Sequence, residues 1–153
     1  MTNQTDDQRL HAGVIPYVSI EGAKSAIEFY KTAFGAVQHG EAVCDDRGRV
    51  MNAGLEINGG MVMIMDHMPE MGSRKMSEPG NPFTMQLVTD QGQFWFDRAV
   101  AAGCTVTMPF ALQFWGDTYG AVVDPFGLAW AFNQPGTESM AQAQAMAKKE
   151  LTS

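Results

Sequence analysis

Few side chains in this sequence have the types and spacing that metal or acid–base chemistry needs. The three histidines, His11, His39 and His67, are far apart in the chain. Asp66, His67 and Glu70 come closest to a ligand set, but adjacent residues of a strand point to opposite faces. We therefore interpret each histidine as a surface residue, and we predict no metal site and no cofactor.

Two acidic residues are candidates for a general base. Glu56 and Asp66 end predicted strands, and a carboxylate that points into a partly apolar cavity can accept a proton from a substrate. The simpler interpretation of Glu56 is a solvated position near a hairpin end. Asp117 and Asp124 stand beside Gly and Pro and are typical of turns. Nucleophile-elbow, phosphate-loop and dinucleotide motifs are absent from the sequence, so no catalytic residue can be named.

Composition excludes several classes of partner. The chain has 153 residues, enough for one domain, and a net charge of -7, which repels nucleic acid and anionic membranes. Cys44 and Cys104 are isolated thiols, as in a reducing compartment, and we expect a cytoplasmic protein. No apolar run approaches the ~20 residues that span a bilayer. Residues 1–10 are polar and are expected to be a disordered lead, not a secretory signal.

Hydrophobic spacing predicts the same element order twice. A strand, a helix that ends at a glycine and three further strands are expected in each half of the chain. The first set covers 14–20, 23–34, 36–44, 50–57 and 61–65, and the second covers 83–89, 93–102, 105 onward with Pro109 as an interruption, 118–123 and 128–132. Between them, residues 67–82 are rich in Pro, Gly and Ser and are predicted to be a linker.

This duplication predicts an α+β fold. Two βαβββ modules, 13–66 and 83–134, would form one domain over 11–135, followed by a polar tail at 136–153 that could contain a short helix. Each module alone would leave one sheet face unburied. We therefore expect an open, curved, eight-stranded mixed sheet around a cup, with the helices on the outer faces. Coincidence among common α+β elements is the alternative explanation of the repeat.

Strand alternation sorts the side chains into two faces. We expect Ala53, Leu55, Trp130 and Phe132 to meet the helices. In the strand ending at Asp66 we expect Val62, Ile64 and Asp66 to share a face, with Asp66 turned inward and the methionines opposite. The inward polar and aromatic set is Tyr17, Ser19, Asn52, Glu56, Asp66, Thr84, Gln86, Tyr119 and Asn133. Such a mixture suits a ligand cleft, although a solvated sheet face would look similar.

Four blocks of sequence carry a family resemblance. They are IPYVS at 15–19, AIEFYKTAFG at 26–35, GRVMNA at 48–53, and QFWGDTYG at 113–120 with DPFG at 124–127. Their order and spacing resemble the PhnB-like branch of the vicinal-oxygen-chelate superfamily, which includes glyoxalases, dioxygenases and bleomycin-resistance proteins. The resemblance runs from about residue 14 to residue 132. It implies paired βαβββ modules and a homodimer.

The resemblance also implies where a metal would bind. Enzymes of the superfamily usually place His or Glu on the first and last strands of each module, and here those positions hold Ile15, Ile64, Thr84 and Ala131. Asn52 stands where many relatives carry His. Divalent metals in such enzymes need imidazole or carboxylate ligands, so we predict a metal-free cup.

The expected function is therefore binding of an unidentified small molecule. An apolar or aromatic ligand would pack against Tyr17, Trp115 and Tyr119, and amides would orient it. The predicted ligand-binding set is Tyr17, Asn52, Glu56, Asp66, Gln86, Gln113, Trp115, Tyr119 and Asn133. Three alternatives stay open: a metal-dependent lyase, isomerase or dioxygenase of the glyoxalase type, a metal-free enzyme with a carboxylate base, and a structural role.

Overall fold

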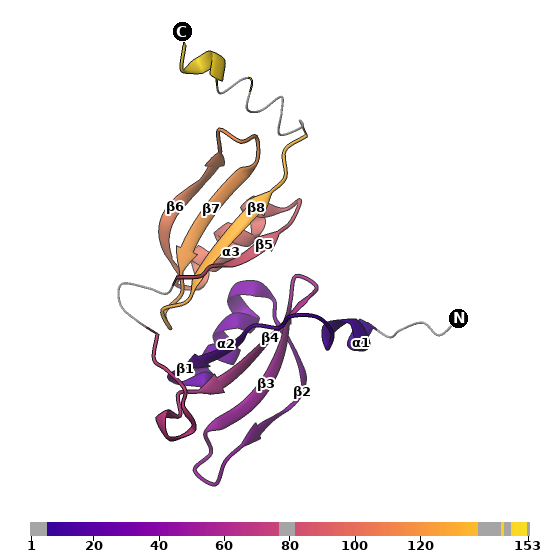
Figure 1. Ribbon diagram of the computed structural model, residues 1–153, viewed down its shortest axis with the longest axis vertical. Coiled ribbons are helices and arrows are strands. Elements are labelled where there is room, and N and C mark those ends of the chain that lie inside the picture. Colours follow the sequence, from indigo (N-terminus) through magenta and orange to yellow (C-terminus); the bar gives the residue numbers. More distant parts are fainter. Residues whose placement is uncertain (1–5, 77–81, 138–144, 146–147, 153) are drawn as a thin grey trace, which may run out of the picture. The chain divides into compact units, whose positions relative to one another are not determined.

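The chain folds into two compact units that repeat one topology. The computed structural model describes residues 6–76, 82–137, 145 and 148–152. The units are Met1–Pro79 and Gly80–Ser153, called module one and module two below. Each holds a four-stranded mixed sheet and one main helix (Figure 1). The predicted order of strand, helix and three strands is confirmed in both. Within the described residues, no helix is long and apolar enough to cross a membrane.

Module one has the strand order β1-β4-β3-β2, with β1 parallel to β4 and the other pairs antiparallel. Residues expected to be a disordered lead include a short helix, α1, whose last residue Leu10 is buried. The elements are α1 (Asp6–Leu10), β1 (Tyr17–Ile20), α2 (Ala23–Phe34), β2 (Val37–Cys44), β3 (Val50–Ile57), β4 (Gly60–Asp66) and the 3-10 turn η1 (Pro69–Met71).

Helix α2 covers one face of the first sheet. Its apolar residues recur at helical spacing, so one stripe of the helix is buried. It ends where Gly35 adopts a left-handed conformation that glycine accepts without strain. The sheet side of this core is formed by Val18, Ile20, Ala53, Leu55, Ile57, Val62 and Ile64, all of which are buried. Packing against α2 therefore fixes which face of each strand is turned towards the helix.

Module two repeats this arrangement with the order β5-β8-β7-β6. Pro109 lies inside the edge strand β6, where a shift of register between Met108 and Ala111 accommodates the missing N–H. The short helix that the sequence suggested for the tail lies mostly outside the described residues. Among the tail residues that the structure describes, 145 and 148–150 are helical. The elements are β5 (Met85–Val88), α3 (Gly92–Ala102), β6 (Thr105–Leu112), β7 (Thr118–Val123) and β8 (Ala129–Gln134).

A buried carboxylate closes the β7–β8 turn. Asp124 is only 4% exposed, and its Oδ1 accepts hydrogen bonds from the backbone N–H groups of Phe126 (2.8 Å) and Leu128 (3.0 Å). Its Oδ2 accepts one from Trp130 Nε1 at 2.9 Å. The prediction that Asp124 is a turn residue is confirmed. Asp45 uses the same pattern of backbone bonds in the β2–β3 turn.

Phe110 of the edge strand β6 is partly buried and packs against the core of module two. Its ring packs 5.8 Å from that of Phe96, which in turn meets Phe132 edge-on at 6.0 Å. Two glycines make room for it, since a Cβ on Gly92 would lie 2.4 Å from the Phe110 ring and one on Gly120 would lie 2.8 Å from the Phe110 Cα. A side chain at Gly120 would have to move backbone atoms, not merely rotate a ring.

We expect Gly120→Ala to lower the free energy of unfolding by about 1–3 kcal/mol, the usual cost of overpacking. Gly60→Ala is the matched control, because its added Cβ would meet only the Ile57 carbonyl oxygen at an ordinary 3.7 Å. The control should be neutral or gain a few tenths of a kcal/mol from reduced chain entropy. Urea denaturation measures both, and equal stabilities would contradict this account of Phe110 packing.

Candidate functional site

The sheet of module one has a second face, which is turned away from α2 and is called the distal face below. Residues paired in register share a face, and Met63 pairs with both Gly54 and Tyr17. His39 joins them because it pairs with Gly54 from β2. By alternation the distal face carries Tyr17, Ser19, His39, Asn52, Gly54, Glu56, Met61, Met63 and Met65.

The predicted facing of β4 is therefore wrong. Ile64 pairs with Ala53 and with Val18, and all three are buried on the side of α2. The tight turn at Asn58 and Gly59, both with positive φ, joins β3 to β4 and ties their alternation together. The methionines consequently lie on the distal face, and Ile64 and Asp66 do not.

Asp66 has a structural role instead of a place in the inward set. Its Oδ1 accepts a hydrogen bond from the Ala23 N–H at 2.9 Å, and its Oδ2 accepts one from the Val50 N–H at 2.7 Å. Gly22, which precedes α2, offers no side chain to cap the helix. The carboxylate of β4 therefore stabilises the helix N-terminus and holds β3 beside it.

A histidine–carboxylate pair lies on the distal face. His39 Nε2 is 2.8 Å from Glu56 Oε2, and the two side chains are 23% and 34% exposed. His39 was interpreted from the sequence as a surface residue, so its partnership with Glu56 was missed. The signal lay in the β2–β3 pairing, which places Val37 opposite Glu56 and His39 opposite Gly54. Such a pair can accept or donate a proton or orient a polar ligand.

Other polar atoms of the distal face differ in how they are engaged. The Tyr17 hydroxyl donates to the Met51 carbonyl oxygen at 2.6 Å, while the residue stays 49% exposed. Asn52 is partly buried. Ser19 Oγ is buried and finds no hydrogen-bond partner among the described residues. A buried hydroxyl without a partner is uncommon and costly, which marks this position for a further polar contact.

The ligand set Asp66, His67 and Glu70, which the sequence analysis considered and did not favour, is not brought together. Asp66 bonds to backbone N–H groups, as above, and His67 Nδ1 lies 3.1 Å from Ser73 Oγ. Glu70 forms an ion pair with Arg49 instead. Each of the three therefore has a separate structural partner, and none of them faces the others as a ligand set would.

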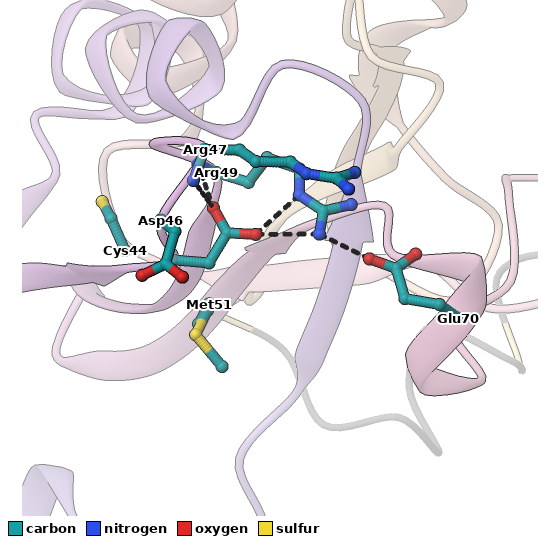
Figure 2. Close-up of a pocket in the computed structure, with 7 residues that line it drawn as sticks. Cys44, Asp46, Arg47, Arg49, Met51 and Glu70 are labelled. Atoms are coloured by element: carbon teal, nitrogen blue, oxygen red, sulfur yellow. Dashed lines mark hydrogen bonds and ion pairs between the residues drawn. The ribbon is translucent and has the colours of Figure 1, made fainter.

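An open cleft of about 610 Å³ lies beside the β2–β3 turn. The Arg49 guanidinium lies 2.8 Å from Asp45 and also forms an ion pair with Glu70. Figure 2 shows Arg49 between two carboxylates. The two carboxylates neutralise the charge of Arg49, and the ion pair with Glu70 links η1 to the β2–β3 turn. The cleft is lined by Cys44, Asp45, Asp46, Arg47, Arg49, Met51 and Glu70.

The corresponding face of module two carries amides and an aromatic ring. Gln86, Tyr119 and Asn133 lie on one face of the sheet, and the buried Trp130 and Phe132 lie on the other face, as predicted. Gln86 is exposed. Asn133 Nδ2 donates to Asp117 Oδ2 at 3.0 Å. The backbone N–H of Gly136 and then this amide hold the pKa of Asp117 below its usual value.

The β6–β7 turn gathers the remaining predicted residues. Trp115 meets Phe114 edge-on at 4.9 Å and Tyr119 at 5.8 Å, and Phe114 is 72% exposed. The side-chain amide of Gln113 donates to the Ala111 carbonyl oxygen at 2.9 Å. The aromatic rings therefore form a cluster, whereas the amide is committed to its own turn.

Comparison with known proteins places this architecture in a family. The model of the Glyoxalase/Bleomycin resistance protein/Dioxygenase superfamily matches residues 17–132. An uncharacterized protein of Mycobacterium bovis is 41% identical over 127 residues, which are 80% of this chain and 83% of that protein. A crystal structure from Pseudomonas aeruginosa aligns with a TM-score of 0.64 at 21% identity, over 82% of this chain and 98% of that one. A PhnB protein of Bacillus cereus aligns with a TM-score of 0.60 at 16% identity, over 80% and 99%.

The chain belongs to the glyoxalase, bleomycin-resistance and dioxygenase superfamily, as its motifs predicted. Divalent-metal ligands in such a fold are expected on the first and last strands of each module. On the faces turned from the helices, those strands carry Tyr17, Ser19, Met63, Met65, Gln86, Ala131 and Asn133. Phenol, hydroxyl, thioether and amide groups fit a divalent ion poorly. Across the described ranges, no three His, Cys, Asp or Glu side chains gather as a metal site.

We expect Asp66→Asn to lower the free energy of unfolding by about 1–3 kcal/mol, because one buried N–H would face an amide donor instead of an acceptor. Glu56→Gln is the matched control on the distal face, where losing a half-exposed pair should cost less than about 1 kcal/mol. Urea denaturation at pH 7 compares them. A larger loss in Glu56→Gln would show that Asp66 does not support α2 as described.

The ion pair of Glu70 predicts a pH dependence. The side-chain hydrogen bond from Arg49 holds the pKa of Glu70 below its usual value. Its stabilising effect is therefore present above the ordinary carboxyl pKa and is lost as pH falls through the lowered value. We expect Glu70→Gln to melt below the wild type at pH 7 and the gap to close in acid. Exposed Glu41→Gln is the control, and a gap that widens in acid would reverse the assigned sign.

Proposed function

We propose that this protein binds a small, largely apolar organic molecule on the distal face of module one without the help of a divalent ion. The observation that carries the proposal is the composition of that face. Met63 and Met65 stand beside the half-exposed ring of Tyr17, with His39 and Glu56 as a hydrogen-bonded pair alongside. Small-molecule sites typically combine an apolar floor with a few placed polar groups.

The methionines suit ligands of irregular shape. A thioether side chain is flexible and polarizable, and it makes favourable contacts with aromatic rings. Tyr17 adds a flat surface, since its hydroxyl is already bonded to the Met51 carbonyl oxygen and its ring is held in place. This combination supports a planar or aromatic ligand. Ser19 Oγ, which is buried without a described partner, supplies a hydroxyl that a ligand acceptor or donor can satisfy.

In module two, Gln86, Trp115 and Tyr119 form a separate candidate surface, which is proposed independently of the site in module one. Gln86 is exposed on the face turned from α3, and Tyr119 on that face contacts the ring of Trp115. Asn133 and Gln113 are the weaker candidates, because their amides already bond to Asp117 and to the Ala111 carbonyl oxygen. Asp66 is not included in the proposed ligand-binding set, because both of its carboxylate oxygens accept hydrogen bonds from backbone N–H groups.

A thermal-shift screen of planar aromatic compounds, run with a strong chelator present, tests the proposal. We expect at least one compound class to raise the melting temperature, because a ligand that binds only the folded state stabilises it. For such a compound, Met63→Ala and Tyr17→Ala should each weaken binding about tenfold, which corresponds to ~1.4 kcal/mol of lost contact.

Met71→Ala is the matched control, since Met71 is a methionine of the same module that is 60% exposed on η1. Its affinity should equal that of the wild type. Calorimetric titration measures all three variants. The proposal is rejected if no compound class shifts the melting temperature, or if a bound compound is indifferent to both Met63→Ala and Tyr17→Ala.

A further inference from the structure

Two methionine sulfurs of the distal face converge over a glycine. A Cβ built on Gly54 would lie 3.2 Å from Met61 Sδ and 3.4 Å from Met63 Sδ. Gly54 is buried, and its missing side chain leaves the space that both thioethers enter. Met61 and Met63 alternate on β4, so both sulfurs reach this one point from the same strand. The result is a pair of soft donor atoms at one place.

An imidazole stands across the same glycine. His39 pairs with Gly54 in the antiparallel β2–β3 ladder, and residues opposite each other in such a ladder have Cβ positions about 5 Å apart. Its Nε2 lies 2.8 Å from Glu56 Oε2, and Glu56 pairs with Met61 on the other side. Two thioethers therefore lie over Gly54, and on the same face an imidazole, oriented by a carboxylate, stands on the neighbouring strand directly across from that glycine.

We propose that Met61 Sδ, Met63 Sδ and the imidazole of His39 bind a soft monovalent metal ion, Cu(I). Thioether and imidazole ligands favour Cu(I), whereas Zn(II) and the harder divalent ions prefer thiolate, imidazole and carboxylate sets. Glu56 fixes the orientation of the ring, as carboxylates commonly do behind metal-binding histidines, and its negative charge offsets that of the ion. The strands hold all the donors, so little ordering is needed on binding.

The local environment suits such an ion. Met61 is only 6% exposed, while His39 and Glu56 keep 23% and 34% of their side-chain surface. The ion would thus reach the sulfurs past the His39–Glu56 pair and be shielded from water on the side of Met61. This inference does not depend on the proposed organic ligand, because every donor comes from the chain itself.

The test is an anaerobic titration of Cu(I) against a chromogenic Cu(I) chelator, with no organic ligand present. The protein carries Cys44→Ser, because the Cys44 thiol is exposed and is a stronger soft ligand than a thioether. Cys104 can stay, since burial raises the pKa of its thiol to about 12 and keeps it protonated. We expect one equivalent of Cu(I) to be held, and no comparable uptake of Zn(II).

Near-isosteric variants then locate the site. Met61→Leu with Met63→Leu keeps the volume but removes both sulfurs, and it should weaken Cu(I) binding at least about tenfold. Glu56→Gln should cost about ten- to a hundredfold, the usual effect of losing the partner of a metal-bound histidine. Met71→Leu, on η1, should bind like the Cys44→Ser parent. Circular dichroism and thermal melting confirm that each variant folds.

X-ray absorption at the copper edge of the Cys44→Ser protein gives a readout that needs no further variant. We expect two sulfur ligands and one nitrogen ligand around the ion. The proposal is overturned if the parent loses Cu(I) to the chelator, if the double leucine variant folds and keeps full affinity, or if the spectrum shows only nitrogen and oxygen. A failed compound screen in the presence of chelator would leave these results unaffected.

Discussion

The register in which β4 pairs with β3 determines the chemistry of module one. Ala53 opposite Ile64 and Gly54 opposite Met63 place one set of side chains under α2 and the other on the distal face. Because side chains alternate with a period of two, a slip by one residue would exchange the two sets. Leu55 and Ile64 are fully buried, so such a slip would expose the core, and the register is held by the hydrophobic effect.

The same register gives Asp66 its role. At the end of β4 its carboxylate lies on the side of α2, where it accepts hydrogen bonds from the Ala23 and Val50 N–H groups. A helix that begins after Gly22 has no side-chain cap of its own, so the sheet provides the acceptor. One carboxylate thus joins the helix to two strands. The carboxylate on the distal face is instead Glu56, which pairs with His39.

Much of the fold was predictable from the sequence, and the facing of one strand was not. Helical spacing and a following glycine predicted α2 to the residue, and the bounds of β3 and β7 were also predicted. Alternation divides the side chains of a strand into two sets, but it does not show which set faces the helix. That depends on how the strand pairs with its neighbour. In β4 both sets are apolar apart from Asp66, so the sequence contains no polarity contrast to orient it.

His39 was missed for a related reason. The β2–β3 ladder shifts register near Val43 and Cys44, so counting pairs outward from the turn does not lead to Glu56. Irregularities of this kind depend on local backbone geometry and leave little trace in the sequence. Trp115 and Tyr119 were both predicted to contact a ligand, and their rings meet at 5.8 Å because Trp115 lies in the β6–β7 turn and Tyr119 follows that turn in β7.

Folding constrains the two faces of each sheet unequally, and this asymmetry explains why the two modules resemble each other on one face and differ on the other. The helix sides of both modules must be apolar, and they are alike in kind: Leu55 and Ile64 in one, Trp130 and Phe132 in the other. The opposite faces bear no such requirement and differ, with thioethers in module one and amides in module two. Where this fold can place imidazole and carboxylate, β4 presents sulfur. These thioethers are the reason that we propose an apolar ligand and a soft ion for this face, because a hard divalent ion gains little from them.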